Sequence, residues 1–168
     1  MSCEQAMIAK VVALDPDHTV EEAMEILNKK AIRAAPVLDA DGKLLGMFGF
    51  HHMLANLLPV SVTMDDGLQN LDFVIGAAPG VSKRLRRLKP QKVADIMDRK
   101  AAVLHPQTPI WEGIRLLVRY GSPLPVINEE DGIFLGLMTE QSAVEELERS
   151  VGDAENEPRR EPVKKSKK

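Results

Sequence analysis

Two short stretches of the sequence carry the residues best able to do chemistry. The first is GFHHM, residues 49–53, in which His51 and His52 are neighbours. The second is MTEQS, residues 138–142, which offers the hydroxyl groups of Thr139 and Ser142. The adjacent histidines raise three alternatives: a metal site, a nucleotide pocket, or only the start of a helix. A hydroxyl at a helix start lies where backbone amides and the helix dipole favour phosphate.

Metal binding and catalysis are not favoured by the distribution of these residues. On a helix the side chains of His51 and His52 diverge by about 100°, so they do not readily ligate one ion. A zinc site would need further ligands, and His18 and His105 fall in predicted loops. The single cysteine, Cys3, is isolated, and no nucleophile-elbow, phosphate-loop or zinc-protease motif occurs. We therefore predict no enzyme activity, no metal and no obligatory cofactor.

The composition is that of an ordinary globular protein. The 168 residues are 44% hydrophobic and 28% charged, sufficient for one compact domain or two small repeats. A net charge of −3 provides no global attraction to nucleic acid. Cys3 lies near a terminus that we expect to be mobile, so we expect an exposed thiol and a reducing compartment. Without a signal peptide or a membrane-spanning run, the chain is predicted to be cytoplasmic and free of membrane contact.

The elements that position these residues occur twice. The segment from His18 to Met53 can be laid over the segment from Gln107 to Ala143. The offset between matching positions is 89 at the first two pairs and 90 at the third. These pairs are Thr19 with Thr108, Pro36 with Pro125, and Gly46 with Gly136. Such self-similarity indicates a repeat architecture.

A helix is predicted near the start of each copy. Thr19 and Glu22 form a capping box for a helix over residues 20–30. In the second copy Thr108 is predicted to cap, Pro109 to occupy the first turn and Gly121 to end the helix. Apolar residues recur on one face of each helix, which is typical of packing against a core. They are Ala23, Ile26 and Leu27 in the first copy, and Ile110, Ile114, Leu117 and Val118 in the second.

After each helix come two short apolar runs joined by an acidic turn that ends in glycine, which predicts a hairpin. A final helix follows, and in the second copy Thr139 can cap it. Each copy therefore reads strand, helix, strand, strand, helix. One copy has too small a core to fold alone, so the two should pack together.

This duplicated order resembles the CBS domain, the cystathionine β-synthase type repeat that occurs in tandem pairs. The resemblance covers roughly residues 7–57 and 92–149, through VVALDPDHTVEEAMEIL, IRAAPVLDADGKLLGMF, KVADIM, LPVINEEDG and LGLMTEQSA. It implies an α+β fold, with two β-α-β-β-α repeats packed as a pseudo-twofold pair that commonly dimerises. It also implies clefts between the repeats that often bind adenosine-containing ligands and regulate another protein.

We accordingly divide the chain into a first repeat at residues 1–57, a helical insert at 58–91, a second repeat at 92–149 and a disordered charged tail at 150–168. Within the insert, residues 66–76 and 80–90 are predicted helices. The second of these is basic on one face, with an apolar stripe of Val81, Leu85 and Leu88. Three interpretations of the basic face stay open: a solvated surface, a contact with phosphate or an acidic partner, and nucleic-acid binding.

The family pattern for a nucleotide pocket is glycine, two apolar positions, Ser or Thr, two variable positions, then Asp. Here Gly49 replaces the hydroxyl and His52 the aspartate in the first copy. The second copy keeps Thr139 but has Ser142 in place of the aspartate. Losing the carboxylate costs about 1.5–3 kcal/mol of ribose binding, which weakens a site without abolishing it. His52 can instead donate to the ligand, and Ser142 can accept a ribose hydroxyl.

Candidate ligand-binding residues follow from the resemblance, position by position. They are Gly49, His51, His52, Thr139, Gln141 and Ser142 in the turns, and Leu14, Asp15, Ala35, Pro36, Leu104, His105, Leu124 and Pro125 along the clefts. The leading hypothesis is a homodimeric regulatory protein that senses AMP, ADP or ATP and signals to an unknown protein. The alternative is a ligand-independent dimerisation scaffold, and the third hypothesis is weak nucleic-acid binding through the basic insert.

Overall fold

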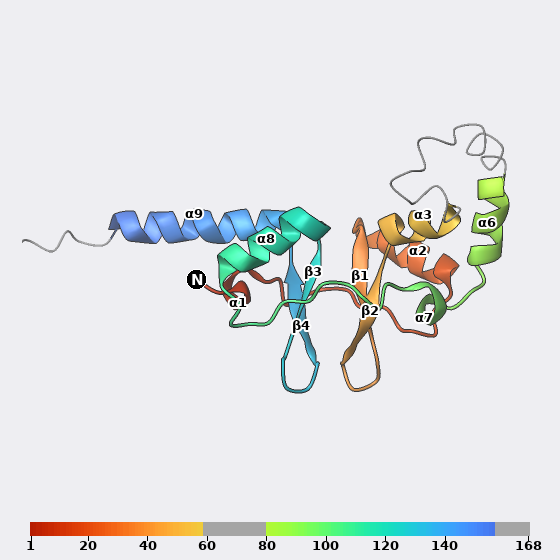
Figure 1. The fold of residues 1–168 in the computed structure, drawn as a ribbon, viewed down its shortest axis with the longest axis horizontal. Helices are drawn as coiled ribbons and strands as arrows, with labels where there is room; N and C mark the ends of the chain where they lie inside the picture. Colours follow the sequence, from red (N-terminus) through yellow and green to blue (C-terminus); the bar gives the residue numbers. More distant parts are fainter. Residues whose placement is uncertain (59–79, 157–168) are drawn as a thin grey trace, which may run out of the picture.

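Two similar units lie side by side in the computed structural model, which describes residues 1–58 and 80–156 (Figure 1). The first unit contains α2 (Val20–Lys30), β1 (Ala34–Leu38), β2 (Leu44–Gly49) and α3 (Phe50–Leu57). The second contains α8 (Ile110–Tyr120), β3 (Leu124–Ile127), β4 (Phe134–Met138) and α9 (Glu140–Asn156). In each unit the strands form an antiparallel hairpin. The predicted α+β fold of two repeats is confirmed.

The first strand of each repeat is reduced to one parallel bridge. Leu14 bridges to Val37, and Leu104 bridges to Val126. Each leucine is held by a hydrogen bond of 2.8 Å from its amide to the carbonyl oxygen of a proline, Pro36 or Pro125. Both leucine side chains are buried, at 2% and 1% exposure, so this one bridge fixes the segment that enters each repeat.

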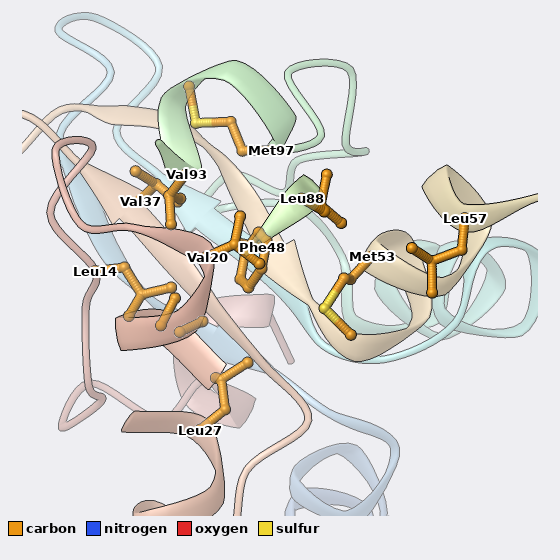
Figure 2. Packing of buried hydrophobic residues seen from close by; sticks show 12 residues of the cluster. Leu14, Val20, Leu27, Val37, Phe48, Met53, Leu57, Leu88, Val93 and Met97 are labelled. Atoms are coloured by element: carbon orange, nitrogen blue, oxygen red, sulfur yellow. The ribbon is translucent and has the colours of Figure 1, made fainter. Parts of the chain in front are cut away.

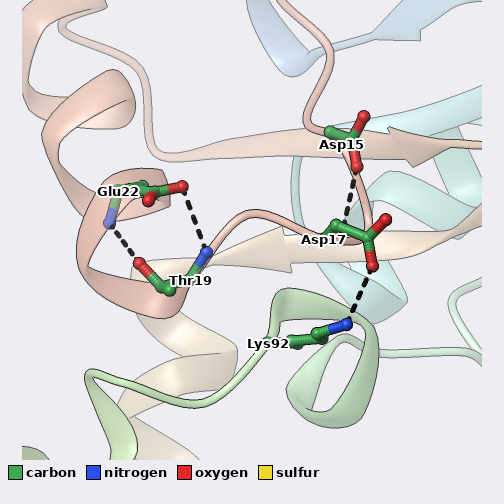
Figure 3. A network of polar contacts seen from close by, with 5 residues as sticks. All are labelled: Asp15, Asp17, Thr19, Glu22 and Lys92. Carbon is green, nitrogen blue, oxygen red and sulfur yellow. Dashed lines mark hydrogen bonds and ion pairs between the residues drawn. The ribbon is translucent and has the colours of Figure 1, made fainter.

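The predicted start of α2 is confirmed. Thr19 Oγ1 accepts from the Glu22 amide at 3.2 Å, and the Glu22 carboxylate accepts from the Thr19 amide at 3.3 Å (Figure 3). This reciprocal capping satisfies two amides that the helix itself cannot. In the preceding loop Asp15 accepts from the Asp17 amide, and Asp17 pairs with Lys92 at 3.2 Å. The loop before α2 is thereby tied to a segment from the other half of the chain.

The predicted capping of α8 by Thr108 is wrong. The N-cap of α8 is Pro109, and Thr108 Oγ1 instead accepts from the His105 amide at 3.2 Å. In the first repeat His18 Nδ1 accepts from the Asp15 amide at 3.1 Å, which is the same contact 90 positions earlier. The two helices are therefore related by 90 positions and not 89, which places the Thr108 hydroxyl one residue too early to cap.

The buried face of α8 also differs from the prediction. Val118 is 82% exposed, and the buried positions of the helix are Ile110, Gly113 and Leu117. A search for apolar side chains misses Gly113, although it is one of the three buried positions of this helix. A Cβ there would lie 2.7 Å from Cys3 Sγ, so the sulfur occupies the space that a side chain would need. Cys3 is completely buried, and the expectation of an exposed thiol is wrong.

Each repeat receives its leading segment from the other half of the chain. Helix α1 (Cys3–Ala6) packs in the second core, and Ile8 pairs with Leu137 through hydrogen bonds of 2.7 and 3.0 Å. Helix α7 (Val93–Ile96) packs in the first core, and Asp98 pairs with Met47 at 2.8 and 3.0 Å. Each core therefore contains residues from outside the segment, 1–57 or 92–149, that the sequence assigned to its repeat.

Two glycines make this exchange of leading segments sterically feasible. A Cβ on Gly46 would lie 2.8 Å from the Asp98 carbonyl oxygen, and one on Gly136 would lie 2.6 Å from that of Ile8. Real Cβ atoms do not approach backbone oxygen so closely. Gly46 and Gly136, which mark the third predicted strand of each copy, therefore have to be glycine because the exchanged segment lies against them.

The first core also incorporates the basic helix of the insert, α6 (Val81–Leu88). Leu88 is buried with Phe48, Met53 and Leu57, and Val81 and Leu85 pack against this cluster (Figure 2). The predicted apolar stripe of this helix is thus confirmed. The helix expected at 66–76 lies outside the described residues. Helix α9 continues beyond residue 150, where we expected the tail, to Asn156, and residues 157–168 also lie outside the described part.

Candidate functional site

A pocket of about 540 Å³ lies between the two repeats. Its walls come from four segments: residues 8–12, residues 30–34, the pair Ser122 and Pro123, and residues 137–141 at the start of α9. The first of these is the extended segment that leads from the second core to the first. The volume falls within the range of about 300–1,000 Å³ that is usual for small-molecule sites. Because both repeats line it, a ligand here would touch both.

The turn at the start of α9 is closed by two side chains. Thr139 Oγ1 accepts from the Ser142 amide at 3.0 Å. Ser142 Oγ accepts from the Thr139 amide at 2.9 Å and donates to the Thr139 carbonyl at 3.1 Å. The Ser142 hydroxyl is therefore committed to the turn, and Ser142 is 7% exposed. The Thr139 hydroxyl accepts in this turn, so its own proton stays available to a ligand oxygen in the pocket.

Backbone amides add to the binding capacity of this turn. The amides of Glu140 and Gln141, at the first two positions of α9, have no acceptor within the helix. They lie at the positive end of the dipole of a 17-residue helix. Both residues line the pocket together with Thr139. The turn can therefore bind an anionic oxygen through two amides and one hydroxyl.

The charges around the pocket favour an anion. Lys10, Lys30 and Arg33 line it, and Glu140 is the only acidic residue among the described residues of the lining. In the described part of the chain none of the three cations takes part in an ion pair. A lining with three cations and one carboxylate lowers the free energy of a bound phosphate. Ile8, Val11, Val12, Ile32, Pro123 and Leu137 complete an apolar wall.

The equivalent turn of the first repeat is built differently. His52 Nε2 donates to the Ile96 carbonyl oxygen at 2.7 Å, which ties α3 to α7. Phe50 packs against the first core. A Cβ on Gly49 would lie 2.7 Å from the Arg33 carbonyl oxygen, so no hydroxyl-bearing side chain fits without a shift. This turn therefore uses its side chains to hold its own repeat together.

Of the fourteen candidate ligand-binding residues, the structure places Thr139 and Gln141 in the pocket lining. Asp15 and His51 are exposed, and His105 is half-buried, with Nδ1 3.3 Å from the Ile127 carbonyl oxygen. Six others are buried core residues of the bridges and strands. They are Leu14, Ala35, Pro36, Leu104, Leu124 and Pro125.

The three cations were missed from the sequence. Lys10, Lys30 and Arg33 occupy a crossing segment, a helix end and a loop, where charged residues are ordinary surface features. Their one signal is position, since each flanks a segment that the resemblance assigns to a cleft. The structure brings them together because the chain crosses between the repeats at residues 8–12.

The groups with a displaced pKa do not line the pocket. Burial raises the pKa of the Cys3 thiol. On α8 the hydrogen bonds from Arg115 lower the pKa of the Glu112 carboxyl. The described residues contain no cluster of three His, Cys, Asp or Glu placed to hold a metal ion. None of the described helices is long and apolar enough to cross a membrane.

Known proteins resemble this chain both in sequence and in structure. An uncharacterized protein of Methanocaldococcus jannaschii is 25% identical over 149 residues, which span 84% of this chain and 88% of that one. The cyclic di-AMP receptor B of Bacillus subtilis is 22% identical, over 84% of this chain and 82% of its own. The solved structure of CBSX2 in complex with AMP matches with a TM-score of 0.64 and 22% identity, over 88% of this chain and 97% of that one.

The family model of the CBS domain matches twice, at residues 3–59 and 93–149. Each match contains one hairpin and the helix before it, together with all of α3 in the first match and the first part of α9 in the second. The chain therefore belongs to the CBS domain family, as a tandem pair of CBS repeats.

Proposed function

We propose that the protein is a regulatory sensor that binds an adenine nucleotide in the pocket beside Thr139 and signals its occupancy to a partner protein. One observation carries the proposal: three cations that form no ion pair with any described residue converge on a pocket at the start of a long helix. Regulation rather than catalysis is the role that CBS pairs typically have. The AMP complex of CBSX2 and the similarity to a cyclic di-AMP receptor support this ligand class.

The phosphate is the part of the nucleotide that this pocket recognises best. The Thr139 hydroxyl, the amides of Glu140 and Gln141 and the side chain of Arg33 can all donate to phosphate oxygens. The apolar wall offers a surface to the adenine ring. Because the Ser142 hydroxyl is committed to its own turn, it adds little to ribose binding. Affinity in this pocket should therefore depend on the phosphate more than on the ribose.

A nucleotide in the pocket would link the two repeats. Residues 30–34 come from the first repeat and the start of α9 from the second, and residues 8–12 cross between the two. Any ligand that binds only the folded pair stabilises it, by about 2.7 kcal/mol at a concentration one hundred times the Kd. This gain in stability of the repeat pair is the signal that we propose a partner protein detects.

A ligand-independent dimerisation scaffold is the second candidate function. The observation that favours it is the turn of the first repeat, where His52 and Phe50 are used in packing. In this view the pocket beside Thr139 is an unused remnant. We propose a homodimer under either function, and a cytoplasmic location stays a proposal from the sequence.

Calorimetric titration distinguishes the two functions. AMP, ADP, ATP, cyclic di-AMP, S-adenosylmethionine and adenosine are each titrated into the purified protein. We expect a nucleotide to bind and adenosine to bind at least about tenfold more weakly, because charged hydrogen bonds are worth about 1.5–3 kcal/mol. Arg33→Gln should weaken binding by about ten- to a hundredfold. Absence of both heat and a thermal shift at millimolar ligand would favour the scaffold.

The matched control is Lys92→Gln. Lys92 is also an exposed cation, but it pairs with Asp17 and does not line the pocket. It should leave the affinity unchanged. Equal losses in Arg33→Gln and Lys92→Gln would indicate general electrostatic attraction instead of a site.

A further inference from the structure

Helix α6 presents a compact basic surface. Residues 81–92, which contain it, hold six cations and no acidic residue, although the whole chain has a net charge of −3. Lys83, Arg84, Arg86 and Arg87 are all exposed. The apolar side of the helix packs in the first core, so these cations lie on its outer face. In Figure 1 this helix lies at the end of the molecule opposite to α9.

The charges of α6 are unfavourable for the helix that carries them. Lys83 and Arg84 lie in its first turn, at the positive end of the dipole, where no acidic residue or side-chain cap offsets them. Lys83 is also one turn from Arg86 and Arg87, and like charges at these spacings repel. None of these four side chains forms an ion pair with a described residue. Conflicts of this kind are expected at functional sites, and a bound anion would remove the repulsion.

Contacts at both ends hold α6 in place. Near its start, Arg84 donates to the Leu57 carbonyl oxygen at 3.1 Å, which fixes the helix against the end of α3. Beyond its end, residues 89–91 accept hydrogen bonds from the first turn of α2. A surface fixed in this way loses less conformational entropy on binding than a mobile one. The basic face is therefore preorganised for a partner.

Helix α2 connects α6 to the pocket. The Val20 amide donates to the Gln91 carbonyl oxygen at 2.9 Å, and the Glu21 amide donates to that of Lys89 at 3.1 Å. The Glu21 carboxylate also lies 3.9 Å from the Lys89 ammonium group. At the other end of the same helix, residues 30–34 line the pocket. A shift of α2 at the pocket would therefore be carried to the segment that ends α6.

The basic surface fits a short acidic segment better than a long polyanion. Helix α6 has eight residues and is about 12 Å long. The exposed carboxylates of Glu21 and Glu22 on α2 border it, since Glu21 contacts Lys89. A nucleic-acid backbone would extend past this surface and meet these carboxylates, and α6 has no aromatic side chain for base stacking. Its apolar side is buried in the core and is not available to a membrane.

The spacing of the cations suits carboxylates on a helix. Lys83, Arg86 and Arg87 stand at i, i+3 and i+4, so carboxylates repeated at the same spacing on another helix can pair with them. Arginine can hold a carboxylate through two parallel hydrogen bonds. We propose that the outer face of α6 is the docking site for an acidic helical segment of the partner protein, and that α2 links this site to the pocket. The inference rests on the proposed function for the role of the partner, whereas docking itself requires no nucleotide.

Fluorescence anisotropy with the full-length protein tests the docking site. The probe is a labelled peptide of about 20 residues of alanine, glutamine and glutamate, long enough to form a helix, whose glutamates recur at i, i+3, i+4 and i+7. A second peptide of the same composition has its glutamates spread around the helix. We expect the first to bind at least about fivefold more tightly. Equal binding of the two peptides, or displacement of the probe by duplex DNA at lower concentrations than by unlabelled peptide, would overturn the proposal.

Charge neutralisation on α6 assigns the binding to this surface. Lys83→Gln with Arg87→Gln should raise the Kd of the peptide at least about tenfold. The matched control, Lys43→Gln with Lys100→Gln, removes two exposed cations outside α6 and should leave the Kd unchanged. Equal losses in both variants would indicate general electrostatic attraction and would overturn the site. The α6 variant should be at least as stable as the unmodified chain in denaturant unfolding, because it removes like-charge repulsion.

Nucleotide tests the link through α2. AMP or ATP, whichever binds more tightly, should change the Kd of the peptide at least about fivefold at saturation, and saturating peptide should change the Kd of the nucleotide by the same factor. An equal peptide Kd with and without bound nucleotide would overturn the link. Arg33→Gln should weaken only nucleotide binding, and the α6 variant only peptide binding. Failure of the docking proposal is therefore distinguishable from failure of the sensor proposal.

Discussion

The turns Gly49–His52 and Thr139–Ser142 occupy the same place in the two repeats, 90 positions apart, yet they use their polar atoms differently. In the first, His52 reaches another element and binds the Ile96 carbonyl oxygen. In the second, Ser142 folds back on Thr139 and leaves the Thr139 hydroxyl at the pocket. The same backbone thus carries two different turns, one whose side chains serve internal packing and one whose threonine lines a pocket.

In contrast to the turns, both repeats share the same close contact between backbone segments. The exchanged segments at Ile8 and Asp98 press on Gly136 and Gly46 in the same way. The scaffold is therefore symmetric where backbone meets backbone, and it is asymmetric where side chains fill the turns. Substitutions at the two kinds of position should separate these contributions.

The largest effect is expected at the shared glycines. Gly46→Val and Gly136→Val should each lower the free energy of unfolding by about 3 kcal/mol, because a side chain would displace the exchanged segment. Denaturant unfolding measures the loss. Gly152→Ala is the control, since nothing lies within 4 Å of its Cβ position on α9, and it should be neutral or stabilising by up to about 1 kcal/mol. If only one of the two valine variants loses stability, the scaffold is not symmetric.

A smaller loss is expected when the hydroxyl of the second turn is copied into the first. Gly49→Thr should cost about 2 kcal/mol, because its Cβ would lie 2.7 Å from the Arg33 carbonyl oxygen. The variant should bind no more nucleotide than the unmodified chain. A second equivalent of bound nucleotide in calorimetry would show that the first turn lacks only a hydroxyl.

Removal of the second turn's buried hydroxyl should separate stability from binding. Ser142→Ala should lower the free energy of unfolding by about 1 kcal/mol, the usual value for a lost capping interaction. Nucleotide affinity should change by less than about twofold, since this hydroxyl is directed at Thr139. Thr139→Val should reduce both quantities. An affinity loss in Ser142→Ala equal to that in Thr139→Val would make Ser142 a ligand contact.

The smallest effect concerns the thiol beneath α8. Burial raises the pKa of Cys3, so the unfolded chain ionises at lower pH than the folded one. The contribution of the protonated Cys3 thiol to the free energy of unfolding is therefore complete below the ordinary thiol pKa, and it declines as the pH rises above that value. Thermal unfolding between pH 7 and about pH 10 should show a decline that is smaller in Cys3→Ala. Rapid labelling of the native thiol by a disulfide reagent would contradict this burial.

Local features of the fold were predictable because they depend on neighbouring residues. The capping box at Thr19 and Glu22, the apolar stripe of α6 and the stop at Gly121 are all encoded within a few positions. The errors arose where one side chain had alternative partners. The Thr108 hydroxyl accepts a hydrogen bond from the His105 amide and does not cap α8. Val118 is exposed, and Gly113 is buried on the face of α8 that packs in the core.

The sequence by itself determined the duplication, the order of elements and the turn at Thr139, since all are recorded in spacing along the chain. Only the tertiary structure decided that residues 3–8 complete the second core, that residues 93–98 complete the first, and that three distant cations share one pocket. The physical reason is that an exchanged segment satisfies its backbone hydrogen bonds and buries its apolar residues on a partner element far along the chain. No local pattern specifies which of two similar hairpins that partner will be.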